Sequence, residues 1–293
     1  MADNKVKYGL QISFTHHPTE IVEQAILAEK LGFDSIWLGE HFFRPGNLAS
    51  IYPYTPHKPL STGEECPDSM VVAGAIAVST KRINITTAIY LLPLRHPLLA
   101  ARAITTAQAL SGNRIRLGVG VGWAKEEYEA FGIPFNERGA RLDEGIDVLK
   151  KALAGGEFEH HGRFYDFNRL TIANQYVPLP LLVGGSTPPI FKRAARVGDA
   201  WAGTPDLSLA DCIEKRTHIE ALRKEYGTDN KPFSYYMRMP AATPHLVAEY
   251  AEAGFTNITV GGGQVVKWTD PLDKKLKFID DIAKLLEIPK PRA

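Results

Sequence analysis

The sequence has few of the features that would assign it to a specialised class of protein. Its 293 residues include only two cysteines, Cys66 and Cys212, whose separation fits neither a disulfide framework nor a zinc site. A formal net charge of +1 argues against nucleic acid or an anionic membrane as a partner. The charged N-terminus is unlike a secretory signal, and no apolar run approaches the roughly 18 residues of a membrane span. We therefore expect a cytoplasmic protein without a membrane-spanning segment.

The sequence also lacks the spacing patterns of common metal and nucleotide sites. Its histidines form neither an HxH nor an HExxH arrangement, so we expect no metal site. The glycines at Gly118, Gly120 and Gly122 are not followed by Lys and Ser or Thr, which excludes a Walker loop.

What the sequence does contain is a regular alternation of short apolar runs and helical patterns. The runs expected to be strands are residues 8–12, 35–39, 82–90, 115–121, 179–183, 199–202, 233–237 and 257–260. Helices are expected between them, among others at residues 70–79, 98–110, 142–153, 190–197 and 209–226. Eight alternations favour a (β/α)8 (TIM) barrel over a doubly wound sheet, in a single domain over residues 1–293.

Two long segments interrupt this alternation. Residues 43–67 form an insertion after the second strand, and residues 158–177 form another before the fifth strand. The first follows a strand, so it is expected at the C-terminal face of the barrel, where active sites are built. Aromatic side chains occur just before it, at Phe42, and within it, at Phe43, Tyr52 and Tyr54. These suit an apolar or planar substrate, but they could equally pack the loop onto the barrel, and the substrate is not readable.

A histidine, His41, follows the second strand in the run Gly39-Glu40-His41-Phe42. Histidine exchanges a proton near neutral pH, and the C-terminal rim of a barrel is where its chemistry takes place. A histidine that only forms a hydrogen bond at the rim is the alternative. Glu40, its neighbour, is expected to point to the opposite side of the strand end and to have a structural or orienting role.

Two strand ends carry glycines and lead directly into helices. The fourth strand is followed by Gly122 and then by an acidic helix that begins near Ala124, and the fifth is followed by Gly184-Gly185-Ser186. Glycine lets a backbone approach a ligand closely, and a helix N-terminus offers N–H groups to a phosphate. The alternatives are an ordinary turn and ordinary helix capping.

These segments resemble the bacterial-luciferase-like superfamily of flavin- and deazaflavin-dependent oxidoreductases over essentially the whole chain. The matching segments are AEKLGFDSIWLGEH, LPLRHPLLAARAITTAQALSGNRIRLGVGVGW, EEYEAFGIPFNERGARLDEGIDVLK, HGRFYDF and LPLLVGGSTPPIFKRAARVGDAW. Residues 92–150 most resemble the branch described as using the deazaflavin coenzyme F-420, and FMN-dependent members share most of the same segments.

The resemblance implies that His41 acts as the catalytic residue beside the reactive centre of the cofactor ring. It implies a bulge with a non-prolyl cis peptide that supports the back of the ring at Thr87, Ala88 and Ile89. The positions that it places near the cofactor phosphate are Gly122, Trp123, Gly184, Gly185 and Ser186. In sugar-phosphate dehydrogenases of the superfamily, a tryptophan follows the strand-two histidine and an acid follows the strand-four glycines. Pro45 and Trp123 stand there in this chain, which argues against sugar-phosphate oxidation.

Three functions are compatible with this resemblance. The first is F-420-dependent hydride transfer to or from a small organic substrate, with His41 as an acid/base or ring-polarising group. The second is an FMN-dependent monooxygenase that receives reduced flavin from a separate reductase. The third is a non-catalytic flavin-binding barrel. The resemblance also implies a homodimer, for which the small, apolar helices at residues 70–79 and 98–110 are candidates.

Overall fold

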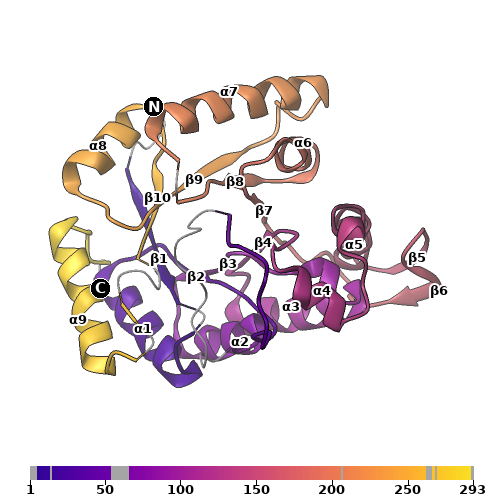
Figure 1. The fold of residues 1–293 in the computed structure, drawn as a ribbon, viewed down its shortest axis with the longest axis horizontal. Coiled ribbons are helices and arrows are strands. Elements are labelled where there is room, and N and C mark those ends of the chain that lie inside the picture. Colours follow the sequence, from indigo (N-terminus) through magenta and orange to yellow (C-terminus); the bar gives the residue numbers. More distant parts are fainter. Residues whose placement is uncertain are drawn as a thin grey trace.

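Eight parallel strands close into a barrel at the centre of the molecule (Figure 1). The computed structural model describes residues 5–13, 15–53, 66–205, 207–261, 266–267 and 269–291. Around the barrel the strands are β1 (Lys7–Ile12), β10 (Asn257–Gly261), β9 (Ser234–Met239), β8 (Ala200–Ala202), β7 (Leu181–Gly184), β4 (Ile115–Val119), β3 (Asn84–Thr87) and β2 (Ser35–Leu38). The expected (β/α)8 barrel is confirmed.

Helices alternate with the strands and cover the outside of the barrel. They are α1 (Pro18–Leu31), α2 (Ser69–Ser79), α3 (Pro97–Ser111), α4 (Lys125–Ala130), α5 (Arg138–Ala154), α6 (Pro188–Val197), α7 (Leu209–Glu225), α8 (Pro244–Glu252) and α9 (Leu272–Leu285). Their ends follow local sequence signals: Gly32 ends α1 in the left-handed conformation, and the side chain of Asp68 caps α2. None of the helices in the described ranges is both long and apolar enough to cross a bilayer.

A few large side chains fill the barrel interior, and small residues on neighbouring strands leave space for them. Trp37 of β2 and Tyr236 of β9 meet with ring centroids 5.1 Å apart. A Cβ on Gly9 of β1 would lie 2.5 Å from the indole nitrogen of Trp37, so only glycine fits there. Nη1 of Arg116 lies 2.9 Å from Oδ2 of Asp34 and also donates to the Tyr236 hydroxyl. Asp34 precedes β2 and Arg116 lies near the start of β4, so this ion pair lies near the end of the barrel at which the strands begin.

The insertion before the fifth barrel strand contains regular structure that the sequence analysis treated as a long connection. It folds as a hairpin of β5 (Glu157–His161) and β6 (Asp166–Thr171), which extends beyond α5 at the edge of the molecule (Figure 1). Glu144 of α5 holds its turn, because its carboxylate accepts hydrogen bonds from the backbone of Phe164 and Tyr165. β5 does alternate, since Phe158 and His160 are turned inward and Glu157, Glu159 and His161 are exposed. The strand is short and its inward face carries only one apolar side chain, so the period-2 pattern is too weak to predict the hairpin.

Candidate active site

The third barrel strand ends earlier than its sequence indicates and continues as a bulge. β3 stops at Thr87, and the peptide bond between Ala88 and Ile89 is cis, as the resemblance implied. Beyond it, Tyr90 pairs with Val119 of β4, and its amide donates to the Gly118 carbonyl at 2.6 Å. The bulge is therefore held on the barrel on both sides of the cis bond.

The glycines of β4 and β7 make room for this bulge. A Cβ on Gly118 would lie 2.0 Å from the Thr87 carbonyl oxygen, and one on Gly120 would lie 2.0 Å from Ile89 Cδ1. A Cβ on Gly184 would lie 2.9 Å from the same isoleucine side chain. At these three positions the space that a side chain would take is occupied by Thr87, at the end of β3, and by the Ile89 side chain of the bulge.

A buried ion pair fixes the strand-two end to the chain beyond the bulge. Arg95 donates from both terminal nitrogens to the Glu40 carboxylate, at 2.7 and 2.8 Å. Glu40, with a side chain only 2% exposed, also accepts from Ser69 Oγ and from the Leu91 amide. Glu40 thus links the strand-two end to α2 and to the chain beyond the bulge, and the structural or orienting role expected for it stays a prediction.

His41 lies at the C-terminal rim and is held by a carboxylate that the sequence analysis did not single out. Its Nδ1 is 3.0 Å from Oε2 of Glu127, on α4, and the two side chains are 11% and 1% exposed. The other oxygen of Glu127 accepts from the Phe42 amide at 2.8 Å. The only sequence signal for this partner is an acidic pair, Glu126-Glu127, in the first turn of a helix.

Glu126, the other acid of that turn, anchors the insertion after β2. Its Oε1 accepts from the Ala49 and Ser50 amides at 2.8 and 2.9 Å, and Ser50 Oγ in return accepts from the Lys125 amide. These backbone donors lower the pKa of the Glu126 carboxyl group against the raising effect of burial. The first turn of α4 therefore holds the insertion at two points, through Glu126 and through Glu127.

The aromatic side chains of the insertion divide into two groups. Phe42 meets the ring of Phe131, at the end of α4, edge-on, and Phe43 meets it at a tilt, which packs the loop onto the barrel. Tyr52 instead meets Trp123 at 5.4 Å between ring centroids, and Trp123 meets the ring of His41 edge-on at 5.6 Å. Tyr54 lies outside the described residues. Trp123 and Tyr52 therefore form an apolar wall beside the histidine.

The turn between β7 and α6 offers polar groups at the barrel rim. Gly185 has a φ of +124°, and its amide donates a hydrogen bond to the Ala202 carbonyl. Pro188 and Pro189 open α6 and have no N–H, and the side chain of Thr187 makes no capping bond. In the described part of the chain, the Ser186 and Thr187 amides make no hydrogen bond, so two backbone donors and two hydroxyls remain available at this turn.

The β4–α4 connection, which contains Gly122 and Trp123, differs chemically from that turn. Gly122 has a φ of +69°, which explains the glycine. The following helix begins with Glu126 and Glu127, and its Lys125 amide is bonded to Ser50. Two carboxylates in the first turn disfavour a bound anion, so the polar chemistry here suits the histidine better than a phosphate.

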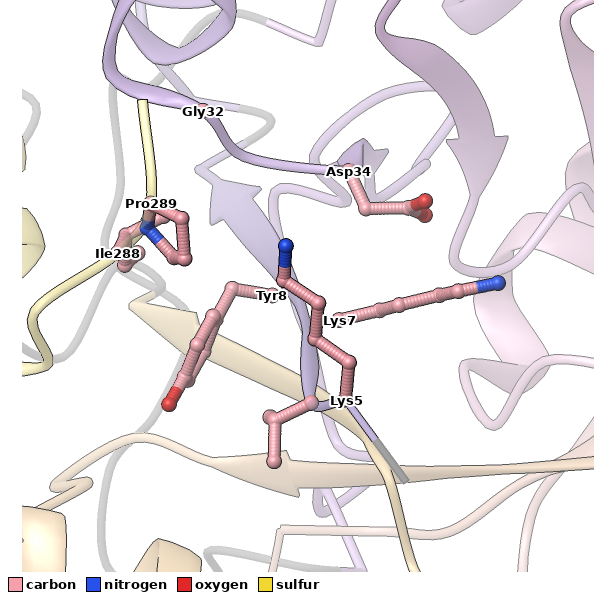
Figure 2. A pocket seen from close by; sticks show the side chains of 8 residues that line it. Lys5, Lys7, Tyr8, Gly32, Asp34, Ile288 and Pro289 are labelled. Atoms are coloured by element: carbon pink, nitrogen blue, oxygen red, sulfur yellow. The ribbon is translucent and has the colours of Figure 1, made fainter. Parts of the chain in front are cut away.

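The described residues outside this rim contain fewer features of a binding site. No group of three or more His, Cys, Asp or Glu side chains among them could hold a metal ion. A hollow of about 260 Å³, lined by residues that include Lys5, Lys7 and Tyr8, opens at the start of β1 (Figure 2). It lies at the end of the barrel opposite the rim that carries His41, away from the face where barrel enzymes react.

Comparison with known proteins identifies the family. The family model described as luciferase-like monooxygenase matches residues 3–258, so the chain belongs to this family, and it is a luciferase-like oxidoreductase. An uncharacterized protein of Mycobacterium tuberculosis (strain ATCC 25618 / H37Rv) is 32% identical over 273 residues, covering 90% of this chain and 93% of that protein.

Two further similar proteins have activities stated in their names. An F420-dependent glucose-6-phosphate dehydrogenase of Beutenbergia cavernae is 32% identical over 192 residues, which cover 64% of this chain and 53% of that enzyme. The solved structure of an F420-dependent secondary alcohol dehydrogenase, in complex with an F420–acetone adduct, matches with a TM-score of 0.78 at 18% identity. The match covers 98% of this chain and 100% of that one, and at this identity it shows a shared fold.

Proposed function

We propose that the protein transfers hydride between coenzyme F-420 and a small organic substrate. The observation that carries this proposal is the arrangement at the C-terminal rim, where a buried carboxylate holds His41 beside an apolar wall. Two F420-dependent enzymes among the similar proteins support the choice of cofactor.

The residues at the rim fit a cofactor that has a flat ring and a phosphate-bearing side chain. The β7–α6 turn offers the unpaired backbone amides of Ser186 and Thr187 and the hydroxyls of the same two residues. Together these donors can bind an anion even though no lysine takes part. Gly184 and Gly185 precede these donors. Thr87 ends β3 and is followed by the bulge at Ala88 and Ile89, whose backbone and isoleucine side chain would support the ring.

Each residue then has a defined task. The deazaflavin, when bound, carries the hydride. For an alcohol substrate, His41 accepts the hydroxyl proton as the adjacent carbon loses its hydride, and in the reverse direction it returns that proton. Trp123 and Tyr52 exclude water from one side of the histidine and present apolar rings to the substrate. We infer an apolar or planar substrate, because the acid expected of a sugar-phosphate dehydrogenase is replaced by Trp123.

An FMN-dependent monooxygenase is the second candidate, favoured by the description of the family. That activity needs reduced FMN from a separate reductase, whereas F-420 needs a partner enzyme only to regenerate its redox state. Both cofactors carry a phosphate, so the β7–α6 turn does not separate them.

Direct binding measurements test the proposal. We expect the purified apoprotein to bind F-420 more tightly than FMN in titrations of the cofactor absorbance or fluorescence. His41→Ala should bind F-420 with similar affinity and lose about 10²–10⁴-fold in turnover on any accepted substrate. Tighter binding of FMN, together with oxygen consumption in the presence of reduced FMN, would replace the proposal by the monooxygenase.

We also propose that the protein is a homodimer formed through α2 and α3. Four large apolar side chains on these two adjacent helices are exposed: Val71, Val78, Leu99 and Leu110. Exposed apolar residues gathered on two packed helices are typical of a surface that a partner covers.

A further inference from the structure

The carboxylate of Glu127 joins two donors from the end of β2. We propose that Glu127 is a positioning residue that decides which nitrogen of His41 carries a proton, an inference that rests on the proposed role of His41 in proton transfer. The two residues are 86 positions apart in the chain, and α4 brings the carboxylate to the strand end.

Both carboxylate oxygens of Glu127 have a hydrogen-bond partner. Oε1 lies 2.8 Å from the Phe42 amide, and Oε2 lies 3.0 Å from Nδ1 of His41. A backbone N–H can only donate, and an ionised carboxylate can only accept. Nδ1 of His41 therefore carries a proton in both the neutral and the charged imidazole. Proton exchange with a substrate is left to Nε2, the nitrogen on the far side of the ring.

Packing fixes the plane of the imidazole as well as its tautomer. Trp123 meets the ring of His41 edge-on, with an interplanar angle of 78°. Glu127 itself is 1% exposed and its backbone belongs to α4, so it cannot follow a rotation of the histidine. The hydrogen bond and the indole together hold Nε2 in one direction, which preorganises proton transfer.

The geometry predicts a specific effect of an isosteric substitution. In Glu127→Gln, one oxygen becomes an NH₂ group that can only donate. The Phe42 amide still needs an acceptor, so the amide oxygen stays with Phe42 and the NH₂ group faces Nδ1 of His41. Nδ1 must then accept, and the neutral imidazole changes from the Nδ1–H to the Nε2–H tautomer. Nε2 then carries a proton already and cannot accept one from a substrate.

Nitrogen NMR of the apoprotein, labelled with ¹⁵N-histidine and held at about pH 8.5 where a free imidazole is neutral, tests this inference. The His41 signals are assigned by their loss in His41→Ala. We expect a protonated Nδ1 and an unprotonated Nε2 in the wild type, and the reverse in Glu127→Gln. Glu129→Gln is the matched control, because it removes the same charge from the exposed side of α4, where Glu129 pairs with Lys125. It should retain the wild-type tautomer.

The same variants separate this inference from the proposed function. Glu127→Gln should keep the melting temperature and the F-420 affinity of the wild type, while turnover falls by about 10²-fold or more. An Nε2–H tautomer in the wild type, or an unchanged tautomer in Glu127→Gln, would overturn the role of Glu127. A changed tautomer with unchanged turnover would leave the geometry standing and refute His41 as the proton-transfer group.

Discussion

Replacing Arg95 with methionine should destabilise the protein more than any other single change at the rim. Methionine keeps the packing of the side-chain stem against the Phe42 and Tyr90 rings, over which the guanidinium now lies at 4.1 and 4.2 Å. It removes the positive charge from a Glu40 carboxylate that is 2% exposed. An uncompensated buried charge costs about 3–5 kcal/mol of unfolding free energy, which corresponds to a melting temperature lower by roughly 6–20 °C.

Glu40→Gln should cost less than Arg95→Met. Glutamine still accepts from the Leu91 amide, and Arg95 keeps a second carboxylate, Asp68, at 3.3 Å. We expect a loss of unfolding free energy of about 1.5–3 kcal/mol, the range for a lost hydrogen bond to a charged group. In the double variant no charge is left uncompensated, so its loss should be smaller than the sum by about 1–3 kcal/mol.

Urea denaturation followed by tryptophan fluorescence, with calorimetry for the melting temperature, measures these values. Arg163→Met is the control: Arg163 is 68% exposed and pairs with Glu137, and its loss should cost less than about 1 kcal/mol. If Arg95→Met were as stable as the control, or if the two single losses simply added, the buried ion pair would not hold the strand-two end to the bulge.

Three further predictions concern other parts of the molecule. Ser186→Ala should weaken binding of a phosphate-bearing cofactor about tenfold or more and leave the melting temperature unchanged, since it removes a donor without straining the turn; equal affinities would exclude this hydroxyl. Burial, aided by the charge of Lys275, lowers the pKa of His16 to about 4, so the unfolded chain binds a proton that the folded protein does not. The unfolding free energy should therefore fall as pH drops from about 6.5 to about 4, and the melting temperature of His16→Asn should depend less steeply on pH than that of the wild type. Val71→Asp and Leu99→Asp together should convert a dimer into a monomer in light scattering, and a wild-type monomer at micromolar concentration would refute the proposed interface.

The barrel could be predicted from the sequence because its strands are buried on both faces. Runs such as residues 35–38 and 115–119 are buried at nearly every position, and helical spacing follows each of them, so alternation alone defines the fold. The strand expected at residues 82–90 is longer than the observed β3, because buried apolar residues continue past the end of the strand. Apolar character continues through Tyr90 and Leu91, which are buried in the bulge and in the turn after it rather than in a strand.

The glycines show where local patterns stop being informative. Gly120 and Gly185 each lie at the end of an apolar run that leads toward a helix, and nothing in the local sequence separates them. In the structure Gly120 makes room for Ile89, whereas Gly185 adopts a φ of +124° in a turn that carries free donors. A glycine required by a neighbouring strand and one required by a turn look alike until the strand order is known.

The partner of His41 could not be predicted for a related reason. A glutamate in the first turn of a helix is sufficiently explained by the helix dipole, so Glu127 carries no signal of its own.

The role proposed for Glu127 depends on the insertion after β2, because Glu126 binds the Ala49 and Ser50 amides and so places that insertion over the same helix turn. Glu126 therefore holds the loop, and its neighbour Glu127 holds the imidazole of His41. A change that loosened the loop would move Trp123 and Tyr52 as well as the histidine, since these rings contact one another. We therefore expect a change in the first turn of α4 to alter substrate preference and proton transfer together.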